Sequence, residues 1–390
     1  MAGSFVRNRY TWLSYLMLAF YAYFLNILGP ITPYLKDQLG LSYTVSSLHF
    51  TAFAFGMVIS GLCGFMVIKR FGKINSLWIG SAGMVLGALI LVSGKTPLLT
   101  IGASFLMGLI GSLILVVVPS ILSDKYGENR GVALSEANTI SSFVSTGAPL
   151  MVGVMVSLAN SWQMALVIVA LAPLLMRFVF RNIESQSSAS IQFDSKLTPT
   201  ALPPLYWLFW LAIVLAVSIE FCMVFWSADF LENGLGLSKI NASQAVSLFL
   251  AGMILGRLAG SRLVNRITNI RLVLLAILVA AAGFFLYWKA TNALPGLVGL
   301  FVTGLGIANL YPIILSMAIG ASNGNNGLAG ARATLASGVA IFSLPLVLGR
   351  LADAVKIQQA YGIVALLLFG VFVIIGIAGF LAQPKRILTQ

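Results

Sequence analysis

One glutamate lies deep inside an apolar stretch of the sequence. Glu220 stands about 15 residues into the run 204–230, roughly 22 Å along a helix that rises about 1.5 Å per residue. We expect it to be the only deep carboxylate. A charge at that depth is costly, so such groups mark proton or ion pathways. We predict that Glu220 is a proton-coupling or cation-binding group; the alternative is a protonated glutamate that only joins two helices.

Other polar and aromatic side chains recur at helical spacing in the apolar stretches. Asn26 lies at nearly the same depth as Glu220 and either binds a substrate or packs. Phe221 and Trp226 could stack on a ring or a cation, or only fill space. Two further groups either line a cavity or hold helices together through hydrogen bonds: Asn138, Ser141, Ser142 and Ser145 in one run, and Asn309 and Tyr311 in another. Asn309 and Tyr311 precede a proline that can bend their helix.

One arginine also lies inside an apolar run. Arg257 has no neutral form at physiological pH and requires a partner. Glu136, a few residues into the run 132–157, is at a similar depth. Glu136 is therefore a candidate partner for Arg257; the alternatives are that Arg257 caps loop carbonyls or binds an anionic substrate. His49 could sense pH, although a lone histidine near a membrane end is more often a satisfied interface residue. Cys63 and Cys222 lie apart with no metal-ligand spacing, so we predict no metal site and no disulfide.

The elements that hold these side chains are long apolar runs. Of the 390 residues, 59% are hydrophobic and only 8% are charged, whereas about a quarter of an ordinary soluble domain is charged. Because a backbone in lipid must satisfy its own hydrogen bonds, the runs predict α-helices rather than barrel strands. We predict an all-α integral membrane protein with twelve transmembrane helices, at 10–35, 44–68, 74–93, 97–122, 132–157, 163–181, 204–230, 241–264, 270–288, 294–319, 328–352 and 358–382.

The basic residues are distributed unequally between the two sides of the predicted membrane. If the N-terminus is inside, sixteen basic residues lie on the cytoplasmic side and six outside, and Arg257 within a span completes the 23. This bias predicts that both termini are cytoplasmic. It also explains the net charge of +13 without nucleic acid as a partner. We expect a monomer in a plasma membrane, the inner membrane in a bacterium.

The second half of the sequence repeats the first at an offset of 196 positions. "GMVISGLCG" at 56–64 returns as "GMILGRLAG" at 252–260, and "LGLS" at 39–42 returns unchanged at 235–238. The repeat predicts two six-helix bundles, 1–181 and 204–390, joined by a cytoplasmic linker at 182–203 that is rich in Ser, Thr and Pro. The repeated glycines form flat faces that allow helices to approach closely. We expect the two halves to meet and rock on them.

These features resemble the major facilitator superfamily, whose members are built from two parallel six-helix repeats around a midplane site. The segment "GFMVIKRFGK" at 64–73 is similar to the family's basic loop between helices 2 and 3, although Ile68 and Lys69 stand where an acidic residue is expected. "NSWQMALVI" at 160–168 and "GRLADA" at 349–354 are similar to the family's entry to helix 6 and end of helix 11. "STGAPLMVG" at 145–153 resembles the antiporter motif of helix 5 loosely, with Ala148 at its glycine position.

The resemblance implies roles for several of the polar residues. In the family, helices 7 and 10 line the cavity, which favours substrate contact for Glu220, Asn309 and Tyr311. Helix 5 packs against helix 8 across the two halves. We therefore predict that Glu136 and Arg257 form a gate on the cytoplasmic side, closed when the cavity faces outward.

The sequence lacks the motifs of soluble catalysis, since no P-loop, HExxH or nucleophile elbow is present. We predict that the protein is not an enzyme and needs no cofactor. A channel or a receptor that does not transport are the competing classes. The preferred prediction is a secondary active transporter of a small organic solute, working by alternating access as a proton symporter. A proton-coupled efflux antiporter and a facilitative organic-anion carrier are the alternatives. One deep acid favours a neutral or cationic substrate; accessibility of Arg257 from the cavity would favour an organic anion.

Overall fold

The first six predicted spans all form helices. The structure, a computed structural model, describes residues 6–181, 201–264, 266–323 and 325–381. Residues 182–200 of the predicted linker at 182–203, with Lys196 among them, lie outside these ranges, as do Lys385 and Arg386. The helices of the first half are α1 (Arg9–Leu39), α2 (Tyr43–Phe71), α3 (Lys73–Ser93), α4 (Pro97–Leu106), the π-helix η1 (Met107–Gly111), α5 (Leu113–Tyr126), the short 3₁₀ turn η2 (Gly127–Asn129), α6 (Arg130–Ala159), α7 (Gln163–Ala170) and α8 (Ala172–Val179).

The second half repeats this order. Its helices are α9 (Pro204–Asn233), α10 (Lys239–Leu263), α11 (Asn269–Trp288), α12 (Ala293–Ile307), α13 (Leu310–Gly320), α14 (Asn326–Val355), α15 (Ile357–Ala360) and α16 (Gly362–Leu381). Within the described ranges, eleven spans are long and apolar enough to cross a membrane, and the sixth is the shorter apolar pair α7–α8. The all-α fold of the sequence prediction is confirmed.

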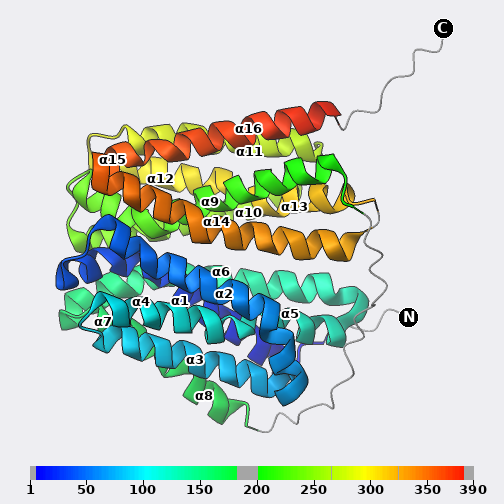
Figure 1. Cartoon of the computed structure of the whole chain (residues 1–390), viewed down its shortest axis with the longest axis horizontal. Coiled ribbons are helices and arrows are strands. Elements are labelled where there is room, and N and C mark those ends of the chain that lie inside the picture. Colours follow the sequence, from blue (N-terminus) through cyan, green and yellow to red (C-terminus); the bar gives the residue numbers. More distant parts are fainter. Residues whose placement is uncertain (1–5, 182–200, 265, 324, 382–390) are drawn as a thin grey trace.

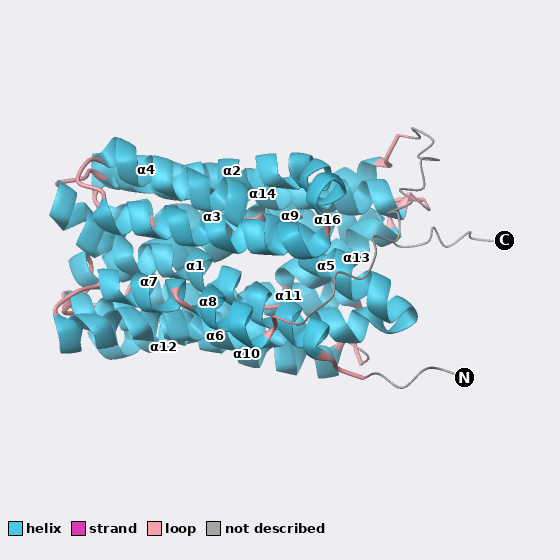
Figure 2. Ribbon diagram, turned by 90° about the horizontal axis from the view of Figure 1, so that it is seen from below, coloured by secondary structure: helices cyan, strands magenta, loops and turns pink. Residues whose placement is uncertain are grey.

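The two halves lie side by side as two groups of helices. Figure 1 shows the first half in blue to teal on one side and the second half in green to red on the other. In the perpendicular view of Figure 2 the long helices again run roughly parallel. Both α1 and α3 begin, and α16 ends, at the end of the bundle that carries the two chain termini. We call it the terminus-bearing end and the other the opposite end.

The repeated "LGLS" sequence forms the same turn in both halves. Gly40 and Gly236 adopt left-handed conformations with φ of 63° and 71°, which glycine tolerates without a Cβ clash. Ser42 and Ser238 then accept hydrogen bonds from the first turns of α2 and α10 as N-caps. The repeat therefore ends one helix and starts the next at the opposite end of both halves.

The repeated glycines pack spans within each half. A Cβ at Gly56 would collide with the backbone of span 4 at Phe105, and one at the equivalent Gly252 with the backbone of span 10 at Phe301. Gly61 touches nothing beyond its own helix, and Gly64 faces Leu113 of its own half. The expectation that the two halves meet on this glycine face is therefore wrong.

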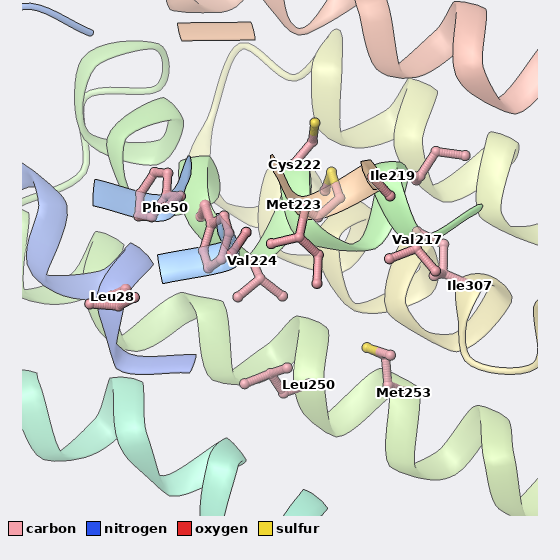
Figure 3. Close-up of a cluster of buried hydrophobic side chains, with 14 of the residues drawn as sticks. Leu28, Phe50, Val217, Ile219, Cys222, Met223, Val224, Leu250, Met253 and Ile307 are labelled. Carbon is pink, nitrogen blue, oxygen red and sulfur yellow. The ribbon is translucent and has the colours of Figure 1, made fainter. Parts of the chain in front are cut away.

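The halves meet instead through large side chains and through other glycines, among them Gly29, Gly153 and Gly349. A Cβ at Gly29 of α1 would collide with the Val224 carbonyl of α9. The rings of Phe50 and Phe225 stack with centroids 4.1 Å apart. Figure 3 shows Leu28 and Phe50 of the first half on the side of Val224 of the second, with Leu250 of α10 below, and Met253 further along α10 toward Val217 and Ile307. The apolar core thus crosses from one half to the other.

Candidate functional site

A cavity lies between the halves near the terminus-bearing end. It has a volume of about 700 Å³ and is walled by α6, α10 and α13. Five residues that the sequence singled out line it: Asn138, Ser142, Arg257, Asn309 and Tyr311. Asn138 and Arg257 are exposed, whereas Asn309 and Tyr311 are half-buried. The cavity therefore presents several polar side chains and is open to solvent.

The break in the tenth span explains where two of these residues lie. The helix is interrupted between α12 and α13, and Asn309 stands at the N-cap position of α13. Its amide donates a hydrogen bond of 2.6 Å to the Gly256 carbonyl of α10. Asn309 therefore holds two cavity walls together, while Tyr311, two residues later, lines the cavity.

The opposite end of the interface is closed by a buried ion pair. The Lys36 Nζ of α1 lies 2.5 Å from the Asp229 Oδ2 of α9, and Asp229 is completely buried. The Tyr43 hydroxyl donates to the other carboxylate oxygen at 3.1 Å, and Lys36 lies 3.9 Å from the centroid of the Tyr43 ring. We call Lys36, Tyr43 and Asp229 the latch. Since a buried charge requires a partner, the latch ties α1 and α2 to α9.

Two further carboxylates reinforce the closure. Asp353, near the end of α14, accepts 2.8 Å hydrogen bonds from the backbone amides of Tyr43 and Thr44. A carboxylate there satisfies free amides of the α2 N-terminus and complements its dipole. Lys239 of the second half pairs with Asp37 of the first. Each contact joins the two halves at the opposite end.

Glu220 lies between the closed end and the cavity. Although it is in the middle of α9, its side chain retains some solvent access. Within the described ranges it has no hydrogen bond or ion pair, and its charge interacts at longer range with Arg257 and Tyr311. An unpaired carboxyl group at this depth can exchange a proton or bind a cation, while Asp229 is a second buried carboxylate that the sequence analysis did not anticipate.

Asn26, Phe221 and Trp226 surround the closest approach of α1 and α9. Because both helices run in the same direction and touch at Gly29 and Val224, Asn26 lies near the level of Phe221. Asn26 donates to its own helix at Ala22 and keeps its side-chain oxygen available. Trp226 is completely buried and donates to the Pro345 carbonyl at 3.0 Å. It therefore seals the interface in this conformation, and a role in substrate binding stays a prediction.

The remaining polar residues fall into two groups. Ser141 and Ser145 are buried and donate to carbonyls of their own helix, Ala137 and Ser142, so the polar stripe reaches the cavity through Asn138 and Ser142. His49 is buried and lies 2.9 Å from the Thr100 hydroxyl. It is a satisfied packing residue in this structure.

Glu136 and Arg257 are not paired in this conformation. Glu136 accepts hydrogen bonds from Arg7 at 2.8 Å and Tyr15 at 3.0 Å, both in its own half. Arg257 donates across the interface to the Ser142 hydroxyl at 2.8 Å. Ser142 is six residues, about 9 Å, further along α6 than Glu136. Since the cavity faces the terminus-bearing end here, a gate that closes in the other state stays a prediction.

The latch was missed because its charges stand at the ends of apolar runs. One signal that charges gather at this end was present, since Lys36 and Glu232 occupy positions 196 apart with opposite charges. In the structure Lys36 pairs with Asp229, and Glu232 pairs with Lys239. Repeat-related ends that carry opposite charges attract each other when the two halves close there. In the described part of the chain no cluster of three or more potential metal ligands is present.

Comparisons with known proteins point to one family. The sequence model of the Major Facilitator Superfamily matches residues 14–318. An uncharacterised MFS-type transporter of Yersinia pestis is 31% identical over 152 residues, which are 39% of this chain and 40% of the relative. The alignment thus spans less than half of that relative's length.

Solved structures share the fold at low identity. A bacterial homolog of the human lysosomal transporter Spinster, in an inward-facing and occupied conformation, has a TM-score of 0.75 with 13% identity and covers 96% of this chain and 98% of its own. The nucleoside transporter NupG has a TM-score of 0.73 with 14% identity over 96% and 99%. The E. coli fucose:proton symporter FucP has a TM-score of 0.60 with 17% identity over 95% and 98%.

Proposed function

The chain belongs to the Major Facilitator Superfamily, and on that premise we propose that it is a secondary active transporter of a small organic solute. One observation carries the proposal: the interface between the halves is closed at the opposite end and hollow at the terminus-bearing end. An asymmetric interface between two repeats is what alternating access requires. With the termini in the cytoplasm, as the charge bias favours, the cavity faces inward.

We further propose that Glu220 couples the transport to protons as a symporter. It is the one acid between cavity and latch, and it lacks a structural partner among the described residues. Protonation would neutralise it when the site crosses the low-dielectric part of the bundle, where a charge is costly. Antiport uses the same group in the reverse order and is the alternative.

The cavity favours an organic anion as substrate. Arg257 lines the cavity and is exposed, and its hydrogen bond to Ser142 uses one of five guanidinium N–H donors. A planar guanidinium with free donors matches a carboxylate or phosphate. This observation supports an anion over the neutral or cationic solute that a lone acid suggested. An organic anion entering with protons is the combined proposal.

The test begins with a thermal-shift screen of the purified protein against carboxylates, sugars, amines and drugs at two pH values. A carboxylate should stabilise the protein, more at low pH. In proteoliposomes with an imposed pH gradient, Glu220→Gln should abolish uphill accumulation and keep exchange of the same solute. Asp124→Asn, which removes an acid outside the interface, is the matched control. Gradient-driven accumulation that survives Glu220→Gln would exclude the coupling role.

A further inference from the structure

A second cavity lies on the outer face of the first half, away from the interface. It has a volume of about 710 Å³ and runs between α3 and the pair α7–α8. Its lining is mostly apolar, with exposed Leu86, Leu89 and Leu174. Because α3 is a membrane-spanning helix, this groove opens toward the lipid.

The groove exists because the sixth span is broken. The chain turns at Leu171, between α7 and α8, and α8 begins with Pro173 in its first turn. Pro173 is the only buried residue of α8, so α8 lies on the outside of α3, as Figure 1 shows. The equivalent twelfth span has no break there, since α16 continues from Gly362 to Leu381. The break at Leu171 thus has no counterpart in α16.

The polar end of the groove is basic. The Arg177 guanidinium lies 5.2 Å from the centroid of the Trp78 ring, and both residues line the cavity. Within the described ranges Arg177 makes no ion pair, and the Trp78 indole N–H has no acceptor. Trp78 stands five residues from the start of α3, about 8 Å into the bundle. This is the level of lipid headgroups, where such residues bind anions.

The length of the groove fits one lipid chain. From Trp78 to Leu89 the wall of α3 runs eleven residues, about 16 Å, which matches one leaflet of an apolar core about 30 Å thick. We propose that this groove binds an anionic phospholipid, with its phosphate at Arg177 and Trp78 and an acyl chain between α3 and α8. A smaller apolar groove of about 350 Å³ at Cys63 and Leu109 has no charged residue in its lining and gives no such selectivity.

Quenching of Trp78 fluorescence by brominated acyl chains tests the proposal. The full-length protein is placed in phosphatidylcholine vesicles that contain either brominated phosphatidylglycerol or brominated phosphatidylcholine, and the Trp78 signal is the difference from Trp78→Phe. Half-quenching should need about fivefold less phosphatidylglycerol than phosphatidylcholine, which corresponds to one well-placed cation at the membrane surface. Arg177→Gln should abolish this preference, and Arg177→Lys should keep most of it.

Arg271→Gln is the matched control. Arg271 is exposed at the same end, at the start of α11 in the second half, so its loss should leave the preference of Trp78 unchanged. All three arginine variants are on the lipid-facing or solvent-facing surface, and monodisperse elution verifies folding. Equal quenching by the two lipids, an equal effect of Arg271→Gln, or cross-links showing a second copy seated over α8 would each overturn the proposal.

Discussion

The two ends of the interface between the halves are held in different ways. At the opposite end the contacts are buried and charged, as with Lys36 and the fully buried Asp229. At the terminus-bearing end Arg257 and Ser142 meet across the interface, and Arg257 is exposed to solvent. Charged contacts are stronger when they are shielded from water. The closed end therefore sets the conformation, and the open end contributes little to it.

This difference implies a division of labour along α9. Asp229 and Trp226 belong to the closed end, where both are fully buried. Glu220 lies earlier on α9, between that end and the cavity, and has no hydrogen bond or ion pair among the described residues. The helix therefore carries a locking group and a chemically available group about 9 residues, or 14 Å, apart. A substrate or proton at Glu220 could influence the latch through the rigid helix.

The largest effect should come from Asp229→Asn. It removes the negative charge that neutralises Lys36 and leaves one acceptor oxygen where Lys36 and Tyr43 now use two. Breaking a buried pair costs about 3 kcal/mol or more. The opposite end should then open. A cysteine at Thr51, whose hydroxyl bonds to the Phe342 carbonyl across the interface, should react with an impermeant maleimide more than about tenfold faster, since 1.4 kcal/mol is about tenfold.

The exchanged pair Lys36→Asp with Asp229→Lys is the control for this prediction. It restores opposite charges and should return the labelling rate most of the way to that of the unaltered latch. A rate that Asp229→Asn leaves unchanged would mean that the latch does not hold the end closed, and the contrast between the two ends would be lost.

A smaller effect at the same end should come from Asp353→Ala. The carboxylate accepts two backbone hydrogen bonds at the start of α2, and loss of such a cap costs about 1 kcal/mol. Labelling at Thr51→Cys should rise about fivefold. Arg350→Gln, an exposed residue one turn earlier on α14, should leave the rate unchanged. Equal rates in the two variants would show that the cap stabilises α2 without joining the halves.

The elements could be predicted from the sequence because lipid imposes a simple rule. Every apolar run long enough to cross a membrane forms a helix or a broken pair of helices, and the "LGLS" repeat correctly marked the same turn twice. The packing of the repeated glycines was predicted wrongly. A face of small residues predicts that another helix packs closely against it, but it does not identify that helix. Gly56 in fact packs against span 4 of its own half.

The candidate site could be predicted only in part. Asn138, Arg257, Asn309 and Tyr311 reach one cavity, because polar residues in apolar helices turn away from lipid. Asp229 could not be placed, since a charge near the end of a run looks the same whether it meets water or a lysine. The partners of Glu136 and Arg257 depend on the conformation, and one sequence encodes both conformations.

The terminus-bearing end should respond to charge reversal with a smaller effect. If Glu136 and Arg257 close this end in the other state, Glu136→Arg should favour opening there. A cysteine at Ser261, which lines the cavity, should label about two- to fivefold faster, because exposed ion pairs contribute at most about 1 kcal/mol. Adding Arg257→Glu should bring the rate back. The labelling rate measures opening of this end whether or not Arg257 also binds the substrate. If the double variant labels as fast as Glu136→Arg alone, the proposed gate is excluded.

The smallest effect should follow Ser142→Ala, which removes the acceptor of Arg257 on α6. A hydrogen bond to a charged group contributes about 1.5 kcal/mol or more when it is shielded from water. The exposure of Arg257 reduces this free-energy contribution, so the labelling rate at Ser261→Cys should fall by less than about threefold. Asn138→Ala removes a cavity residue that bonds only to its own helix at Leu134 and should not change the rate. The contradicting result would be a fall in the labelling rate at Ser261→Cys as large as the rise that Asp229→Asn causes in the labelling rate at Thr51→Cys. The exposed Arg257–Ser142 contact would then stabilise this end as strongly as the latch stabilises the other, and the two ends would not differ in kind.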